Sequence, residues 1–177
     1  EYLNIFQLIS IKPVVYICNV DENSSVNGNA YTKAIEKYSK LNNSETLLVS
    51  AKIEYEISQI SDHEEKKMFL DSIGLKETGL KRVIKKGYEI LNYINFFTAG
   101  EKELRAWTII KGTLAPVAAG EIHSDMEKGF IRAETISYED YIQYKGESGA
   151  KEKGKLRLEG KEYKIKDGDI IHFLFNV

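Results

Sequence analysis

The feature of this sequence that most constrains its fold is a pair of short, continuous apolar runs separated by a helical pattern. The runs occupy residues 14–18 and 46–49, and between them residues 30–41 carry apolar side chains at helical spacing. Continuous apolar runs of this length are typical of strands that a parallel sheet buries on both faces. The order strand, helix, strand therefore predicts one βαβ unit of an α/β domain.

The pattern changes near residue 94. Before it, helices are expected at 53–60, at 64–73 and from Thr78 onward, and the last of these has an apolar face of Leu80, Val83, Ile84, Tyr88 and Leu91. After it, short strand-like runs at 106–110, 130–136, 155–158 and 170–175 alternate with glycine turns, and helical propensity is confined to 138–144. The second part is therefore predicted to be a small α+β domain, with the boundary between residues 93 and 94.

Composition excludes several classes of protein. The formal net charge is −2 and 42% of the residues are hydrophobic, which is typical of a soluble globular protein without a global basic signature for nucleic acid. The single cysteine, Cys18, excludes an intramolecular disulfide framework and fits a reducing compartment. No apolar run has the length of a membrane span. We therefore expect a cytoplasmic protein with no membrane partner.

Polar motifs follow both predicted strands of the βαβ unit. Asn19-Val20-Asp21-Glu22 follows the first strand, and Ser50-Ala51-Lys52 follows the second. Ligands of open α/β sheets bind outside the carboxyl ends of the strands, which is where both motifs fall. Either motif alone matches ordinary turns often by chance. Their joint occurrence at two neighbouring strand ends predicts a ligand-binding site at this edge of the sheet.

The pair resembles the N-K-x-D and S-A-K base-recognition motifs of P-loop GTPases, with two departures. Val20 stands at the lysine position, and Glu22 stands at the aspartate position. An aspartate there can accept the adjacent N1–H and N2–H₂ donors of guanine together, whereas adenine offers no such pair of donors. The N-x-x-E form resembles YchF-type Obg-like proteins. The resemblance continues through residues 96–100, 103–108, 120–125, 129–134, 154–161 and 167–173.

This resemblance implies a fold and a function for each part. Residues 1–93 would be the C-terminal part of a P-loop NTPase domain of the G type, with residues 1–10 ending a helical insertion. Residues 94–177 would be a TGS domain with a β-grasp, ubiquitin-like fold. The family implies a ribosome-associated, Mg²⁺-dependent ATPase that prefers ATP to GTP. The base-binding residues that it implies are Asn19, Val20, Glu22, Ser50, Ala51 and Lys52, with Asn19 at the Hoogsteen edge of the base and Lys52 beside its plane.

The sequence contains no G-x-x-x-x-G-K-[ST] motif. Phosphoryl transfer requires the phosphate-cradling amides and lysine of such a loop, together with Mg²⁺. We therefore expect no catalytic residue in this chain and no ATP hydrolysis by the chain alone, with ATP and Mg²⁺ bound in the full-length protein. The alternative is a nucleotide-independent interaction module, in which the TGS domain binds a partner and the first 93 residues are a scaffold.

Other candidate sites have simpler interpretations. His123 with Asp125 two residues later could suggest a metal site, but no third ligand follows at a suitable spacing, and a structural histidine is expected. A set of aromatic residues with one arginine could stack on RNA bases, namely Trp107, Phe130, Arg132, Tyr141 and Tyr144, although core packing is the expectation for aromatic side chains of a small domain. The basic residues of 151–157 leave an RNA contact through this domain open.

Overall fold

The computed structural model describes residues 5–6, 8–100 and 103–176, and these divide into two compact units. Unit 1 is Glu1–Ile90 and unit 2 is Leu91–Val177, so the division lies three residues before the boundary predicted from the sequence. Of residues 1–10, expected to end a helical insertion, 1–4 and 7 lie outside the described part of the chain. Ile9–Ile11 form a short 3₁₀ turn, η1.

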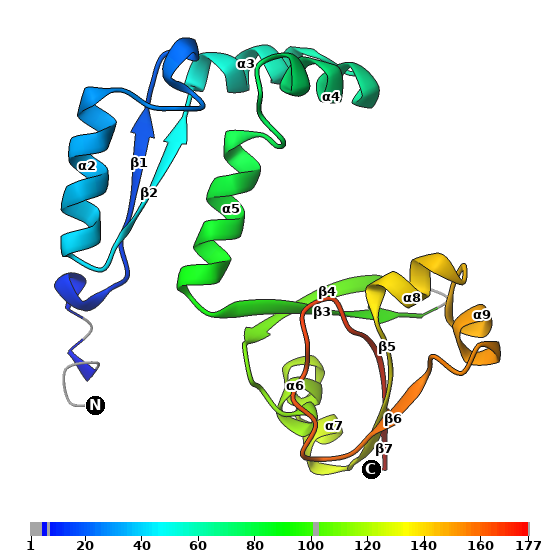
Figure 1. Cartoon of the computed structure of the whole chain (residues 1–177). Coiled ribbons are helices and arrows are strands. Elements are labelled where there is room, and N and C mark those ends of the chain that lie inside the picture. Colours follow the sequence, from blue (N-terminus) through cyan, green and yellow to red (C-terminus); the bar gives the residue numbers. More distant parts are fainter. Residues whose placement is uncertain (1–4, 7, 101–102, 177) are drawn as a thin grey trace. The chain divides into compact units, whose positions relative to one another are not determined.

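Unit 1 contains the predicted βαβ unit (Figure 1). Strands β1 (Val15–Asn19) and β2 (Glu45–Val49) pair in parallel, with Asn19 opposite Val49, and helix α2 (Ala30–Leu41) connects them. Asn29 caps α2 by accepting hydrogen bonds from two backbone amides of its first turn, which fixes where the helix begins. The parallel pairing brings the carboxyl ends of both strands to one edge of the sheet.

Three further helices follow in the described part of unit 1. Helices α3 (Ala51–Gln59), α4 (His63–Ser72) and α5 (Gly79–Ile90) follow β2 in sequence. The buried cluster of this unit lies in the α3–α4 region and comprises Ile53, Ile57, Leu70 and Leu75. All three helices begin and end close to the positions that their sequence patterns predict.

The expectation of strands buried on both faces is wrong for the residues described. The described sheet of unit 1 has only two strands, and the side chain of Ile17 in β1 is 53% exposed. Similarly, Leu80 and Ile84 on the apolar face of α5 are more than half exposed. A two-stranded sheet has an edge on either side, so its aliphatic side chains lack the neighbours that a larger parallel sheet provides.

Unit 2 is a five-stranded mixed sheet with helices, in the strand order β4-β3-β7-β5-β6. Its strands are β3 (Tyr93–Ala99), β4 (Leu104–Ile110), β5 (Phe130–Ile136), β6 (Arg157–Glu159) and β7 (Ile170–Phe175). Strands β3 and β7 pair in parallel, and the other neighbouring strands are antiparallel. This agrees with the predicted α+β class.

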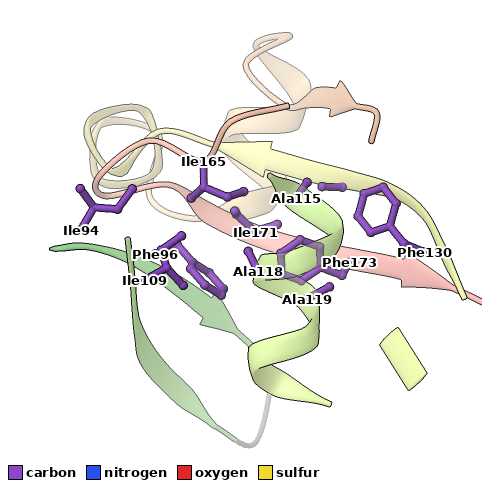
Figure 2. Close-up of a cluster of buried hydrophobic side chains, with 11 residues drawn as sticks. Ile94, Phe96, Ile109, Ala115, Ala118, Ala119, Phe130, Ile165, Ile171 and Phe173 are labelled. Carbon is purple, nitrogen blue, oxygen red and sulfur yellow. The ribbon is translucent and has the colours of Figure 1, made fainter. Parts of the chain in front are cut away.

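The prediction of a single short helix in unit 2 is wrong. Besides α8 (Tyr138–Gln143), which matches the prediction, the unit contains α6 (Ala115–Ile122), α7 (Ser124–Lys128) and α9 (Glu147–Glu152). Helix α6 carries the small residues that let it approach the sheet closely. Figure 2 shows Ala115, Ala118 and Ala119 of this helix facing the aromatic and aliphatic side chains of the strands.

The core of unit 2 is built around aromatic side chains. Phe96 is fully buried, meets the ring of Phe173 edge-on with a centroid distance of 5.8 Å, and stacks on Trp107 at 6.4 Å. Phe130 also contacts Phe173. Offset and edge-to-face pairs of this kind add to the hydrophobic stabilisation of the buried rings. The expectation that Trp107 packs against a core, and does not present a free stacking surface, is consistent with these contacts.

No helix among residues 5–6, 8–100 and 103–176 has the length and apolar character needed to cross a membrane.

Candidate functional site

The two polar motifs predicted to form one site lie side by side at the carboxyl edge of the β1–β2 pair. Asn19 is the last residue of β1, and its Oδ1 atom accepts a hydrogen bond of 3.0 Å from the backbone amide of Ala51. The backbone amide of Val20 donates to the carbonyl of Val49, at the end of β2, over 2.9 Å. Residues separated by some 30 positions in sequence are therefore joined directly, as parallel pairing requires.

The first motif continues into a short 3₁₀ turn, η2 (Glu22–Ser24), which Asp21 caps. The Asp21 carboxylate accepts hydrogen bonds from the backbone amide of Ser24 at 2.9 Å and from its hydroxyl at 3.1 Å. The hydroxyl of Ser25 donates to the carbonyl of Glu22 over 2.6 Å. Asp21 therefore has a local structural role, and the turn holds the backbone of Glu22 in place.

The second motif forms the beginning of α3. Ser50 is buried at 4% exposure, and its hydroxyl caps the helix by accepting from the backbone amide of Ile53 at 3.5 Å. This capping role explains why a small hydroxyl residue suits this position. Ala51 and Lys52 then form the first turn of the helix, with the Ala51 amide directed at Asn19.

Glu22 and Lys52 form an ion pair across the two motifs. Both side chains are largely exposed, with relative accessibilities of 41% and 66%. The hydrogen bond from Lys52 lowers the pKa of Glu22, and the same contact raises the pKa of Lys52. Both groups therefore remain charged around neutral pH, and the rim of the site carries a paired carboxylate and ammonium group.

Glu54, in the first turn of α3, links this helix to α5, a role that the sequence did not indicate. Its carboxylate accepts hydrogen bonds from the backbone amides of Gly79, at 2.6 Å, and Leu80, at 3.2 Å, and so caps α5 from α3. A Cβ atom at position 79 would lie 2.9 Å from Glu54 Oε1 and 3.0 Å from the side chain of Val49, so any larger residue there would have to displace these neighbours. No local pattern predicts this contact, because 25 residues separate Glu54 from Gly79.

All six residues predicted for the base site fall at this edge, although they have different roles. Asn19 accepts a hydrogen bond from Ala51, and Glu22 forms an ion pair with Lys52. Ser50 caps α3. Val20 contributes a backbone hydrogen bond to the end of β2. The side-chain NH₂ of Asn19 has no protein acceptor among the hydrogen bonds of the described residues, so it is available as a donor toward a ligand.

The histidine and cysteine candidates do not form a site. His123 caps α7, accepting a hydrogen bond from the Asp125 amide through Nδ1 at 3.2 Å, which agrees with the structural role expected for it. Among the described residues, no group of three His, Cys, Asp or Glu side chains is placed to hold a metal ion. Cys18 is partly buried, and burial, followed by the nearby charge of Glu36, raises the pKa of its thiol.

Comparison with known proteins identifies the class to which this arrangement belongs. Residues 93–176 match the family YchF-GTPase_C, described as a protein of unknown function (DUF933). Proteins named ribosome-binding ATPase YchF from Bacillus subtilis and Escherichia coli O157:H7 are each 52% identical, over 172 and 169 residues. These alignments cover 96% of this chain and 47% and 46% of the two relatives.

Solved structures agree with the sequence matches. The Schizosaccharomyces pombe YchF GTPase superposes with a TM-score of 0.81 and 36% sequence identity, over 97% of this chain and 46% of that one. A GTP-binding protein from Pyrococcus horikoshii, 18% identical, shares the fold with a TM-score of 0.63 over 93% of this chain and 46% of its own. The chain belongs to the YchF family, which confirms the resemblance seen in its sequence. It spans about half the length of the curated relatives it matches.

Proposed function

We propose that this chain supplies the base-reading site and a partner-docking domain of a ribosome-binding ATPase. In this proposal unit 1 is the C-terminal part of a P-loop NTPase domain, and unit 2 is a TGS domain of β-grasp fold. The mixed sheet of unit 2, with parallel β3 and β7 at its centre and α6 packed against it, supports the second assignment. The names of the 52% identical relatives support the activity.

The observation that carries the proposal is the bond between Asn19 and Ala51. This bond engages Oδ1 of Asn19 and fixes the side-chain amide at the edge of the parallel strands. The NH₂ group of the same side chain can then donate to N7 of a purine. The same bond occupies the Ala51 amide. Guanine carries an acceptor, O6, next to N7, whereas adenine carries a donor, N6–H₂, at that place. Because the Ala51 amide already donates to Asn19, it is not free to donate to O6 of guanine. The site therefore favours adenine over guanine.

The phosphates and Mg²⁺ would be bound by residues outside this chain. The sequence has no phosphate-binding loop, and a base site alone supplies neither the affinity nor the electrostatic stabilisation that phosphoryl transfer needs. The relatives are about twice as long as the aligned region, which leaves room for such a loop. ATP hydrolysis is therefore proposed for a full-length protein that contains this chain, and Mg²⁺ would there neutralise charge on the phosphates.

Replacing Glu22 by aspartate in the full-length protein tests the base site. The side chain of aspartate is one methylene shorter, so its carboxylate reaches Lys52 less well. Aspartate is also the residue that reads guanine in the N-K-x-D motif. We expect the ratio of GTP to ATP affinity to rise by roughly tenfold, the low end of what one bidentate base contact contributes. Titration calorimetry with both nucleotides measures the ratio, and Glu64→Asp on the exposed start of α4 is the matched control. A ratio of GTP to ATP affinity that is unchanged in the Glu22→Asp protein contradicts the proposal. Equal affinities of the wild-type protein for ATP and GTP also contradict it.

The ribosome is proposed as the partner because the curated relatives carry it in their names. Co-sedimentation with ribosomes across a salt series checks this part, and we expect pelleting at low salt that weakens as salt rises. Failure to pellet even at low salt would favour the alternative of an interaction module with a different partner.

A further inference from the structure

The ion pair between Glu22 and Lys52 has a consequence for nucleotide selectivity, which rests on the proposed function of this edge as a base site. Glu22 stands where a guanine-reading carboxylate would stand, and an unpaired glutamate could still accept the N1–H and N2–H₂ donors of guanine. The extra methylene of Glu22 alone therefore does not explain why such a site would reject GTP. The structure adds the missing element, because the Glu22 carboxylate already has a cationic partner.

The other carboxylates near Lys52 are engaged elsewhere or lie farther away, so Glu22 is the carboxylate in contact with Lys52. Asp21 accepts from the amide and hydroxyl of Ser24, and Glu54 accepts from the first amides of α5. Glu56, one turn along α3, acts on Lys52 only through longer-range attraction. Val20, at the position where the GTPase motif has lysine, carries no charge that could compete for the carboxylate.

The backbone on both sides of the ion pair is held in place independently of it. Hydrogen bonds from the Ser25 amide and hydroxyl fix the carbonyl of Glu22. The Ser50 cap and the bond from Ala51 to Asn19 fix the first turn of α3, which carries Lys52. Changing the side chain of Lys52 should therefore alter the availability of the carboxylate without moving the motifs.

We propose that Lys52 determines nucleotide selectivity by holding the Glu22 carboxylate in an ion pair and so denying guanine its acceptor. A guanine that used this carboxylate would have to displace the ammonium group, whereas adenine, which has no donors on that side, binds with the ion pair intact. The ion pair also screens the lone pair at adenine N1 from a bare negative charge. Both effects act in the same direction, toward ATP.

The test compares ATP and GTP affinities of the full-length protein with those of Lys52→Met, which keeps an unbranched side chain as far as Cε and removes the charged ammonium group. We expect the ratio of GTP to ATP affinity to rise by about tenfold in Lys52→Met and to stay close to wild type in Lys52→Arg, which keeps the charge. Lys67→Met, an exposed lysine of α4 without an ion pair among the described residues, is the matched control and should leave the ratio unchanged.

A second measurement on the 177-residue chain is independent of nucleotide. Carboxyl NMR titration should show the pKa of Glu22 rising toward its ordinary value in Lys52→Met. An unchanged pKa of Glu22 means that the ion pair does not form in solution and overturns the inference. A ratio of GTP to ATP affinity that stays at the wild-type value in Lys52→Met overturns this inference alone. If the wild-type full-length protein binds neither nucleotide, the proposed function fails and the inference fails with it.

Discussion

Replacing Phe96 by alanine is expected to lower the free energy of unfolding of unit 2 by about 3–5 kcal/mol, the usual cost of removing a buried phenyl ring. Phe96 has no exposed surface and contacts both Trp107 and Phe173, so its removal leaves a cavity between sheet and helix. A change of this size is comparable to much of the stability of a small domain, and a large unfolded fraction at 37 °C is expected.

The single tryptophan of the chain, Trp107, stacks on Phe96 and reports this transition directly. Urea unfolding followed by tryptophan fluorescence gives the difference in free energy. Leu104→Ala, at a residue of β4 that is 75% exposed, is the matched control and should change stability by less than about 0.5 kcal/mol. A Phe96→Ala protein as stable as this control would contradict the core described here.

The second large effect is expected at Asp169, a carboxylate with only 2% exposure. It accepts hydrogen bonds from the Tyr163 hydroxyl at 2.6 Å, the Lys166 amide at 2.9 Å and the Arg157 guanidinium at 3.2 Å. Asp169→Ala leaves all three donors without this acceptor, and we expect unit 2 to lose roughly 3 kcal/mol of stability. Urea unfolding measures the loss. The control is Glu162→Ala, at an exposed residue that forms no ion pair within the described part of the chain.

Tyr163 provides an independent readout of the same network. Burial, and then the hydrogen bond to Asp169, raise the pKa of its phenol. In Asp169→Ala the second cause is absent, so the Tyr163 phenol should ionise at lower pH than in the wild type, as followed by ultraviolet absorbance. Wild-type stability together with an unchanged tyrosine titration would show that Asp169 does not organise this part of the fold.

The parts of the fold that the sequence predicts are those encoded by local patterns. Strands β5 and β7 begin and end at the predicted residues, 130–136 and 170–175, because their apolar runs are bounded by turns and polar residues. Helix α2 matches for a similar reason, since Asn29 supplies a clear cap. Where periodicity and capping coincide, the sequence alone is sufficient.

The helices missed in unit 2 have weak local signals. Helices α7 and α9 are five and six residues long, and α9 lies among glycines that favour turns. Helix α6 is short and rich in alanine, and its position depends on the close contact of Ala115, Ala118 and Ala119 with the sheet. Such packing is a tertiary property that periodicity does not report.

The residues of the candidate site were predictable, whereas their contacts were not. Strand ends in a parallel βαβ unit must meet at one edge, so the sequence places Asn19 and Ser50 near each other. The pairing of Glu22 with Lys52, and the support of α5 by Glu54, depend on side chains that meet only after the chain has folded. Sequence reasoning therefore finds the location of the candidate site and misses the internal pairs to which we attribute its proposed selectivity.

Photoaffinity labelling of the full-length protein with 2-azido-ATP tests the central claim most directly. The azide lies on the edge of the base that would face Glu22 and Lys52, so the labelled peptides identify the residues around the purine. The account predicts ATP-competed labelling within residues 19–22 or 50–52. Labelling confined to other segments, or labelling that excess ATP does not reduce, would contradict the assignment of this edge as the base site.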